Sequence, residues 1–521
     1  MIGAKDGERV IAKRRSAEVN SRLLDFCRES SGHPGNVDPM ATRGKTDNQR
    51  IRITDNATDW TNWLFYGDNL EILHNNFADE SVDLIYLDPP FQSGASYNHL
   101  FKEESGAKAH AQVEAFADTW EWNDYSIEAY GRLIQSHDQQ TARTIGAMNQ
   151  ILGPSNMLSY LVMMAERLLE LRRVLKPTGS IYLHCDPTAS HYLKIIMDSI
   201  FGAENFLNEV VWMYGLGGSS KRYWPRKHDI IFWYSKEKDK HYFDPAMVPA
   251  KSNMMKGKLK KAPDYWDIPS INNMSKERLG YPTQKPLQLL TRIVESSCPP
   301  GGLVLDPFCG CGTAVEAAQH LDRRWCGIDI TALAIDLVSQ RMTSRFPNEM
   351  DSGFQITGLP QDVEGARMLF ERSPLQFEQW AVMQLGGAPN KVQVGDRGID
   401  GKMLLATREQ GVYETALVSV KGSKVVNPSM VRDLVGTITR EDAAYGVLLT
   451  FEPPTRGMLK EAQSAGTRYS DWYNMTFPRI QFITVEELLD GKRPQLPPAI
   501  GQSVKPERAD ENVESLTFFD D

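Results

Sequence analysis

The sequence predicts an α/β protein with a mostly parallel sheet, followed by a second and smaller α/β unit. Short runs rich in Val, Ile, Leu and aromatic residues alternate with helical patterns from about residue 51 to residue 345. Strands that alternate with helices are typical of a parallel sheet covered on both faces. The expected strands are 63–66, 82–87, 180–184, 230–234, 303–305 and 325–328, and two of the expected helices are 156–175 and 288–297.

Length and shifts in composition divide the chain into several parts. At 521 residues the chain exceeds one ordinary domain, so two or three folding units are expected. Polar residues without periodicity at 1–50 indicate an N-terminal tail, and weak patterning with prolines at 346–373 indicates a linker. The remaining parts are a first domain at 51–345, a second α/β unit at 374–490 and an acidic, proline-containing tail at 491–521.

The composition indicates a soluble, cytoplasmic protein. Hydrophobic residues make up 41% of the chain and charged residues 24%, which is typical of a globular protein. There is no run of about 18 apolar residues and no apolar signal core, so no membrane association is expected. The six cysteines form no CxxC pair, and Cys309 and Cys311 are too closely spaced for an ordinary zinc knuckle. We expect reduced, space-filling cysteines.

Charge is distributed unevenly along the chain. The formal net charge is −9, which argues against bulk attraction to a polyanion. Between Lys221 and Lys261, however, about a dozen lysines and arginines stand against about four acids. This basic stretch predicts a confined anion-binding surface, and a solvated loop is the alternative interpretation.

One tetrapeptide carries the groups of a reaction centre. Asp88-Pro89-Pro90-Phe91 follows the expected strand 82–87, and ligands of open α/β sheets bind beyond the carboxyl ends of strands. The prolines fix φ and remove two donors, so rigid carbonyls there are free to accept hydrogen bonds. The Asp88 carboxylate and the Pro89 carbonyl could each accept one hydrogen of an exocyclic amine and direct its lone pair at an electrophile. Phe91 offers a stacking face worth about 1–3 kcal/mol. A plain proline turn is the alternative.

A glycine-rich loop follows the expected strand 303–305 and precedes a helical pattern. Glycines permit close approach of a ligand to the backbone, and the start of a helix offers unpaired N–H groups. The loop matches neither the dinucleotide-binding fingerprint nor a P-loop. The acid at its start, Asp306, suits a cationic amine. We expect a cofactor site that includes Asp306, Phe308, Gly310, Gly312 and Thr313.

Two further acids follow expected strands of the same domain. Asp329 comes about 20 residues after the glycine loop, where an acid is placed to bind ribose hydroxyls. Asp68 follows the strand 63–66 and precedes a helix. It could bind an amino group of the cofactor or cap that helix, and both interpretations remain open.

These stretches together resemble the β class of amino-group DNA methyltransferases, most closely the modification subunits of type III restriction systems. The catalytic motif of that class precedes the cofactor loop, which is the circularly permuted order found here. The resemblance implies a Rossmann-like S-adenosylmethionine-dependent methyltransferase fold, with a seven-stranded sheet and a reversed terminal strand. It also implies that Thr283, Gln284 and Lys285 lie by the methionyl end of S-adenosylmethionine. The matching stretches are 67–68, 83–91, 171–186, 200–212, 281–286 and 306–313, within about 60–350.

The resemblance also concerns the substrate, which it implies is double-stranded DNA. Aspartate at the first position of the catalytic motif is commoner in the adenine enzymes of this family, whereas cytosine-N4 enzymes commonly carry serine. Asp88 therefore favours N6 of adenine, with N4 of cytosine as the alternative. Target recognition in this class fits residues 215–280, where Tyr223 and Trp224 could stack on bases or wedge between them. The expected phosphate contacts are Lys221, Arg222, Arg226, Lys227, Lys256, Lys258, Lys260 and Lys261.

The second unit resembles Mrr-type restriction endonucleases, which often carry GIDG followed by QxK. Asp400 lies in such a GIDG, and an acid that binds Mg²⁺ beside Lys421 would suit metal-dependent phosphodiester cleavage. Ser419 occupies the position of the Gln or Glu, and serine is a poor metal ligand. Cleavage would then require Glu378 as a second carboxylate. A structural hairpin in a domain that binds DNA or partners is the alternative.

Three functions compete at this point. The first is an adenine methyltransferase with a fused restriction-endonuclease-like domain, acting in restriction or phage defence. The second is a solitary methyltransferase with a non-cleaving, DNA-binding accessory unit. The third, a non-enzymatic S-adenosylmethionine sensor, is disfavoured because residues 88–91 retain each group that the chemistry needs. A homodimer and a complex with restriction or defence subunits both remain open.

Overall fold

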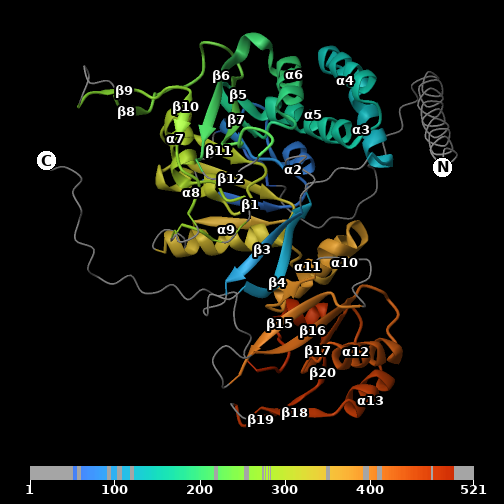
Figure 1. Ribbon diagram of the computed structural model, residues 1–521. Helices are drawn as coiled ribbons and strands as arrows, with labels where there is room; N and C mark the ends of the chain where they lie inside the picture. Colours follow the sequence, from blue (N-terminus) through green and yellow to red (C-terminus); the bar gives the residue numbers. More distant parts are fainter. Residues whose placement is uncertain are drawn as a thin grey trace, which may run out of the picture. The chain divides into compact units, whose positions relative to one another are not determined.

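The computed structural model describes most of the chain between residues 51 and 497 (Figure 1). At 96–102 and 108–117 it describes the backbone alone. The tail expected at 1–50, the chain beyond residue 497, Phe91 and Lys256 lie outside the described residues. The described ranges are 51–55, 60–90, 96–102, 108–117, 122–215, 221–250, 257–272, 275, 277–279, 281, 283–347, 353–390, 398–407, 413–470 and 473–497.

A nine-stranded sheet is the frame of the first domain. The strands from β5 to β13 run parallel, and β7 is antiparallel to both of its neighbours. Each of the six strands expected from the sequence is present. The order across the sheet is β10 (Tyr265–Asp267), β6 (Phe206–Met213), β7 (His228–Ser235), β5 (Leu175–Cys185), β2 (Val82–Leu87), β11 (Leu303–Asp306), β12 (Arg324–Asp329), β1 (Asn62–Tyr66) and β13 (Phe354–Thr357).

The sheet differs from the seven strands with a reversed terminal strand that the resemblance implied. The described residues add a short strand at each edge, β10 and β13. The reversed strand β7 lies inside the sheet, between β5 and β6. It does so because β6 and β7 form an antiparallel pair, and β7 is the member that joins β5. Two further hairpins, β3 (Ser96–Lys102) with β4 (Lys108–Ala117) and β8 (Met247–Pro249) with β9 (Leu259–Lys261), are separate from this sheet.

Helices cover both faces of the large sheet. On one side lie α7 (Leu287–Ser297), α8 (Thr313–His320) and α9 (Ala332–Arg345), and on the other α2 (Asn69–Asn76), α5 (Asn156–Val174) and α6 (Ser190–Phe201) (Figure 1). The helices α3 (Asp124–Ile134) and α4 (Gln139–Leu152) pack on α5. The α5 helix begins where the Ser155 side chain accepts from the Leu158 N–H, which satisfies a donor that a helix start leaves unpaired.

The stretch 346–373 differs from the linker that its weak patterning indicated. β13 pairs in parallel with β1, and Phe354 packs on Trp325 with ring centroids 5.6 Å apart. The helix α10 (Val363–Arg372) follows and is capped by the Asp362 side chain. A strand of four residues at a sheet edge gives too short a pattern to recognise from periodicity.

Residues 374–490 contain a second sheet and several helices. Its order is β14 (Ala388–Pro389), β15 (Gly401–Ala406), β16 (Tyr413–Lys421), β17 (Tyr445–Thr450) and β20 (Ile480–Thr484). The first three strands are antiparallel and the last three are parallel. The other elements are α11 (Pro374–Gln384), α12 (Pro428–Arg440), α13 (Arg456–Ser464), β18 (Thr467–Ser470), β19 (Met475–Pro478) and α14 (Val485–Leu489).

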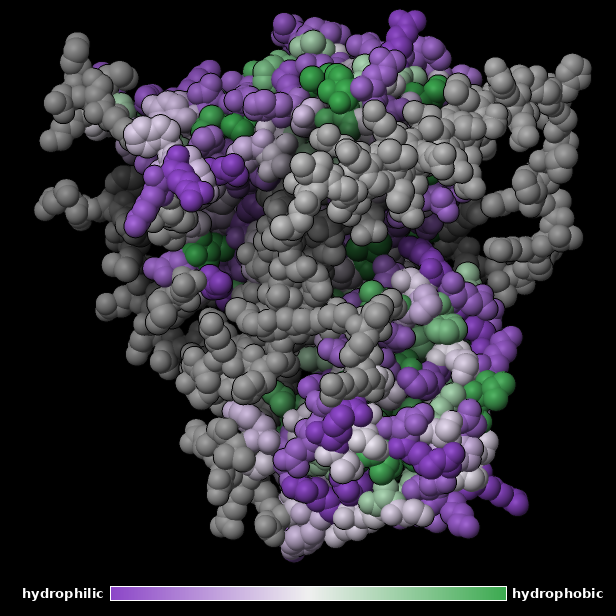
Figure 2. All heavy atoms as spheres, turned by 45° about the vertical axis from the view of Figure 1, so that its right-hand side comes forward, coloured by the Kyte–Doolittle hydropathy of each residue, from purple (hydrophilic) through white to green (hydrophobic). Residues whose placement is uncertain are grey.

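The described surface is mainly hydrophilic on the face shown in Figure 2, where hydrophobic side chains form small separate patches. None of the described helices is long and apolar enough to cross a membrane. The expectation of reduced core cysteines is confirmed for the cysteines that the structure describes. The buried cysteines that form no disulfide are Cys185, Cys298, Cys309, Cys311 and Cys326.

A buried carboxylate ties three central strands together. Asp83 lies in β2, whose residues are all buried, and is 6% exposed. Its Oδ2 accepts from the Leu303 N–H at the start of β11 at 2.8 Å. Both carboxylate oxygens accept from Lys176 Nζ of β5, at 3.0 and 2.9 Å. Removing one partner of such a buried ion pair is strongly destabilising, because the other charge is left buried without compensation.

Asp83→Ala should lower the free energy of unfolding by about 3 kcal/mol, because the Lys176 ammonium and the Leu303 N–H lose a buried acceptor. Asp55→Ala is the matched control. Asp55 pairs with the same ammonium, but its side chain is 48% exposed. Its loss should cost less than about 1 kcal/mol. Urea unfolding of both variants measures the difference, and equal losses would contradict the role given to Asp83.

Candidate active site

The strand order creates a crevice between β2 and β11. From β2 the chain passes through α5 to β5, and from β11 it passes through α8 to β12, on the opposite side. Strand order therefore reverses between two neighbours, and ligands of open α/β sheets bind at such a switch point, beyond the carboxyl ends. A cavity lies there, lined by residues that follow β1, β2, β11 and β12.

This cavity gathers most of the site residues expected from the sequence. Phe91 lies outside the described residues, and Gly312 is not among the lining residues. The Asp88–Pro90 turn and the glycine loop are far apart in the sequence, and both line this one cavity. The expected residues that line it are Asp68, Asp88, Pro89, Pro90, Thr283, Gln284, Lys285, Asp306, Phe308, Gly310, Thr313 and Asp329.

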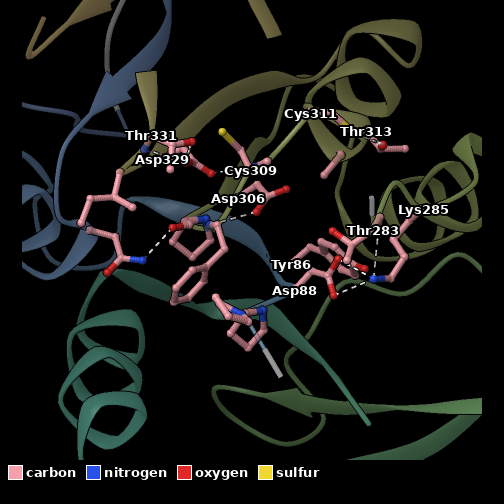
Figure 3. Close-up of a pocket in the computed structure, with 18 of the residues that line it drawn as sticks. Tyr86, Asp88, Thr283, Lys285, Asp306, Cys309, Cys311, Thr313, Asp329 and Thr331 are labelled. Atoms are coloured by element: carbon pink, nitrogen blue, oxygen red, sulfur yellow. Dashed lines mark hydrogen bonds and ion pairs between the residues drawn. The ribbon is translucent and has the colours of Figure 1, made fainter. Parts of the chain in front are cut away.

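The Asp88 carboxylate is held by a buried ammonium group. Lys285 Nζ donates to both Asp88 oxygens, at 2.9 and 2.6 Å, and Lys285 is 8% exposed. Figure 3 shows the two side chains side by side at one end of the cavity. The resemblance implied that Lys285 lies by the cofactor, and the structure places its ammonium group on the Asp88 carboxylate. Lys285 is therefore the counter-charge of Asp88.

Asp306 is a buried acid at the end of β11. It is 4% exposed, and its Oδ1 accepts from the Phe308 N–H at 3.2 Å. Burial raises the pKa of Asp306 well above its ordinary value, and the charges of Asp88 and Asp329 raise it further. A cation beside the carboxylate would offset this cost, because an opposite charge stabilises the ionised form. The electrostatics at Asp306 suit a cationic group of a ligand.

Asp329 joins the end of β12 to the glycine loop. Its Oδ2 accepts from the Gly310 N–H at 2.9 Å, and its Oδ1 accepts from the N–H and the hydroxyl of Thr331 at 2.9 and 2.8 Å. Burial raises the pKa of Asp329, while these hydrogen bonds act in the opposite direction. The carboxylate is thereby fixed in the cavity wall, as an acid that binds ligand hydroxyls must be.

Two glycines of the loop have backbone angles that other residues avoid. The φ angle is +49° at Gly310 and +77° at Gly312, in the left-handed region. A Cβ at Gly310 would lie 3.2 Å from Tyr281 Cε1, and one at Gly312 would lie 2.8 Å from Val338 Cγ2. The loop needs glycine at both positions, for conformation and for space.

A buried arginine supports the same loop from α9. Arg341 Nη1 donates to the Cys311 carbonyl at 2.9 Å and to the Thr313 hydroxyl at 3.1 Å. Its guanidinium pairs with Glu316, and both side chains are 2% exposed. The sequence analysis missed Arg341, although a charged residue among the apolar positions of a helix was an available signal.

Asp68 has structural partners on two sides. Its side chain accepts from the Leu70 N–H at 2.8 Å and caps α2, so the helix-cap interpretation is confirmed. Arg167 of α5 donates to both of its oxygens, at 3.1 and 2.8 Å, and to Asn69 Oδ1 at 2.6 Å. Asn69 Nδ2 in turn donates to the Pro307 carbonyl at 2.7 Å. This chain of bonds joins the end of β1 to the loop after β11, and the sequence analysis missed Arg167 and Asn69.

Gln284 shapes the loop that carries Lys285. Its Oε1 accepts from the Leu279 N–H at 2.8 Å, and its Nε2 donates to the Glu277 carbonyl at 2.7 Å. The Thr283 carbonyl lies 3.5 Å from Lys285 Nζ. Thr283 and Gln284 both line the cavity. The side-chain amide of Gln284 bonds within its own loop.

The basic stretch lies at the connection between β6 and β7. Tyr214 N–H donates to the Lys227 carbonyl at 3.2 Å and closes this connection. Trp224 is 92% exposed and Tyr223 is 66% exposed. Because β6 ends and β7 begins where β2 ends, the connection stands at the same edge of the sheet as Asp88. Lys221, Arg222 and Arg226 are exposed, Lys227 is partly buried, and Lys258, Lys260 and Lys261 lie in or beside β9.

In the second unit, Asp400 and Lys421 come together as the sequence predicted. Lys421 Nζ lies 3.6 Å from Asp400 Oδ2. The same oxygen accepts from the Val420 N–H at 2.6 Å and from the Ser419 hydroxyl at 3.3 Å. Glu378 lies partly buried in α11. The described residues contain no group of three or more His, Cys, Asp or Glu side chains that could hold a metal ion, which gives the expected Mg²⁺ site no support.

The fold is a doubly wound α/β domain with a cavity at its switch point, beside an acidic proline turn. Comparison with known proteins indicates which family of α/β proteins the domain resembles. Residues 82–340 match the family model described as DNA methylase, of the N6/N4 methyltransferases. This segment of the chain is similar to the N6/N4 DNA methyltransferase family.

A type II methyltransferase and a subunit of a type III restriction-modification enzyme are among the relatives that match the chain. The type II methyltransferase M.HpaI of Haemophilus parainfluenzae is 35% identical over 202 residues, 38% of this chain and 63% of that protein. The Mod subunit of the type III enzyme StyLTI of Salmonella typhimurium is 32% identical over 154 residues, 29% of this chain and 20% of that protein. The chain thus spans less than two thirds of either relative. The solved structure of the cytosine-N4-specific PvuII DNA methyltransferase matches with a TM-score of 0.35 and 16% sequence identity. The match covers 57% of this chain and 95% of that chain, and the likeness is weak.

Gly312→Ala should lower the free energy of unfolding by about 2–3 kcal/mol, because it adds overlap with Val338 to the strain of a positive φ. Gly466→Ala is the matched control. Gly466 has φ +78°, and no described atom would lie within 4 Å of its added Cβ. It should cost only about 1 kcal/mol. Urea unfolding measures both, and Val338→Ala should recover part of the loss in the Gly312 variant. If both glycine variants lose the same amount, close packing is not the constraint.

Proposed function

We propose that this chain transfers the methyl group of S-adenosylmethionine to the exocyclic amino group of a DNA base, with N6 of adenine as the favoured acceptor. One observation carries the proposal: the Asp88-Pro89-Pro90 turn and the glycine loop after Asp306 line a single cavity. A methyl donor and its acceptor must be held in one site at near-contact distance. The family of residues 82–340 supports DNA as the substrate and an amino group as the acceptor.

The residues of the cavity fit S-adenosylmethionine. Asp306, buried and near other acids, suits the amino cation of the methionyl part. Asp329 is fixed in the wall by Gly310 and Thr331 and suits the ribose hydroxyls. When bound, the cofactor supplies an activated methyl group on a positively charged sulfur. We assign the remaining wall to Asp68, Thr283, Gln284, Phe308 and Thr313, with Gly312 shaping the loop.

Asp88 and Pro89 orient the acceptor amine in the proposed mechanism. The amine donates one hydrogen to the Asp88 carboxylate and the other to the Pro89 carbonyl, so its lone pair points into the cavity. Pro89 and Pro90 keep this turn rigid and offer no competing backbone donors. Lys285 holds the carboxylate through both oxygens, which still have lone pairs to offer. Asp88 is also placed to take the proton that the methylated amine releases.

The substrate amine is paired inside a DNA duplex, so the base must leave the stack at a cost of a few kcal/mol. We assign residues 215–280 to target recognition. The exposed basic residues near Trp224 support this assignment, because phosphate contacts from lysine and arginine position a duplex. Trp224 and Tyr223 are proposed to contact bases, and Phe91 to stack on the extruded base.

The base and the biological role follow from the family pattern. Asp88 at the first motif position favours adenine N6, and cytosine N4 is the alternative outcome of the test. Methyltransferases of type II and type III restriction systems are among the matching relatives, which supports a role in restriction-modification or phage defence. The chain would act there as a homodimer or with partner subunits.

Incubation with DNA and methyl-labelled S-adenosylmethionine tests the proposal. Labelled N6-methyladenine is expected, and Asp88→Ala should reduce incorporation about a hundredfold or more, because the amine loses its orienting acceptor. Asp79→Ala, in a side chain that is 74% exposed, is the control and should methylate normally. Nucleoside mass spectrometry identifies the base. Label in cytosine would correct the target, and label in no base would overturn the proposal. Wild-type activity of the Asp88 variant would overturn the site assignment.

Cleavage of DNA by residues 374–490 is a second candidate function. The pairing of Asp400, directly before β15, with Lys421 at the end of the neighbouring strand β16 favours it. Against it, Ser419 stands at the position of a metal ligand, and the Asp400 oxygen that faces Lys421 is engaged by the Val420 N–H. The described residues contain no group of three or more acids, histidines or cysteines that fits a metal ion. A non-cleaving DNA-binding module is the alternative.

Lys421→Ala separates these two readings of the second unit. If the unit cleaves DNA, the wild-type protein nicks plasmid DNA in the presence of Mg²⁺, and the variant loses this activity while methylation continues at the wild-type rate. Gel analysis of plasmid topology measures the breaks. Breaks that persist in the variant would remove Lys421 from the proposed nuclease site, and a wild-type protein that makes none would leave the DNA-binding module.

A further inference from the structure

A chain of hydrogen bonds next to Asp88 is not used by the proposed mechanism. His184 in β5 is completely buried, and its Nδ1 lies 3.1 Å from the hydroxyl of Tyr86 in β2. Its Nε2 lies 3.1 Å from Oδ2 of Asp229 at the start of β7. The ring also packs edge-on against Trp212, with centroids 5.5 Å apart. An imidazole held on both nitrogens and by an aromatic neighbour has one orientation.

Asp229 determines which nitrogen of His184 carries the hydrogen. Burial raises the pKa of Asp229, but the hydrogen bond with His184 and the positive charge of Lys285 act in the opposite direction, and the net shift is downward. An ionised carboxylate only accepts, so Nε2 donates. Burial raises the pKa of Tyr86 well above its ordinary value, so its hydroxyl keeps its proton and can donate to Nδ1. In its neutral form an imidazole has one donor and one acceptor, and for this form both nitrogens of His184 have a matching partner.

The same chain of bonds reaches the catalytic carboxylate. His184 Nδ1 lies 4.0 Å from Asp88 Oδ1. Tyr86 and Asp88 are two residues apart at the end of β2, so their side chains leave the strand on the same face. Lys285 contacts both oxygens of Asp88. The carboxylate therefore has the Lys285 ammonium and the Tyr86–His184 pair as its immediate neighbours.

We propose that Tyr86, His184 and Asp229 are positioning residues for Asp88, an inference that rests on the proposed function. With Nδ1 occupied by the Tyr86 hydroxyl, His184 offers no hydrogen to Asp88, and the carboxylate keeps its lone pairs for the amine of the target base. Asp229 directly follows the basic residues at the β6–β7 connection. Tyr86, His184 and Asp229 form a hydrogen-bonded array. The array connects the start of β7, in the candidate recognition region, to the Asp88 carboxylate that receives the base.

Breaking the array at either end should impair turnover and leave cofactor binding intact. Tyr86→Phe deletes the donor to Nδ1, and Asp229→Asn deletes the charge that keeps the hydrogen on Nε2. In Asp229→Asn the new amide can donate to Nε2, so His184 can carry its hydrogen on Nδ1 and donate it to Asp88, in competition with the amine. In Tyr86→Phe, Asp229 keeps the hydrogen on Nε2, and the lone pair of Nδ1 faces the Asp88 carboxylate without the Tyr86 donor and repels it from its position. A misplaced reacting group of this kind costs roughly tenfold to a hundredfold in kcat.

Tyr182→Phe is the matched control. Tyr182 lies in the same strand as His184, and its buried hydroxyl bonds to Ser297 at 2.7 Å, so the variant deletes a comparable hydroxyl outside the array. The measurements are kcat and KM for methylation, the Kd of S-adenosylmethionine by calorimetry, and Tm. Expected is a fall in kcat of about tenfold or more for Tyr86→Phe and Asp229→Asn, with Kd within about twofold of wild type. The control should keep kcat.

The outcomes separate this inference from the proposed function. If the wild-type protein methylates DNA but Tyr86→Phe keeps the kcat of Tyr182→Phe, the array is overturned and the proposed function stands. A loss that appears in Kd for the cofactor instead of kcat also overturns it. A wild-type protein that methylates no base overturns the proposed function, and the array falls with it.

Discussion

The pairing of β2 with β11 is the constraint on which the rest of the site depends. Leu84 pairs with Val304 and Ile85 with Leu305, in parallel, so two strands far apart in the sequence end at the same edge of the sheet. Asp83 reinforces this pairing through the Leu303 N–H. The crossovers from the two strands leave in opposite directions, which opens the space between their ends. The Asp88–Pro90 turn and the glycine loop meet because of this arrangement.

Acids at the ends of these strands concentrate negative charge in the cavity. Burial together with Asp88 and Asp329 raises the pKa of Asp306, while Lys285 supplies a counter-charge to Asp88. Without a ligand, this arrangement costs free energy that a cationic molecule would offset. In the proposed function, Asp306 would hold the amino cation of S-adenosylmethionine, which would supply a positive charge to this acidic cavity.

Much of the fold was predictable because its signals are local. The run 82–87 is apolar apart from one acid and ends in two prolines, and the loop from Asp306 to Thr313 lies between a strand and a helix. The strand β13 was missed because four residues at a sheet edge show little periodicity. Arg167 and Arg341 were missed for another reason. Their sequence neighbours do not indicate what they bind, since their partners come from other elements.

The sequence by itself determined the strands, the two ligand loops and the types of residue in them, because backbone preference and residue chemistry are encoded over a few neighbouring positions. Tertiary structure alone decided the partners. It placed Lys285 on Asp88, His184 between Tyr86 and Asp229, and the helix-cap role on Asp68. Such pairings depend on strand order and on side-chain direction across the sheet. Neither is written in any short stretch of the chain.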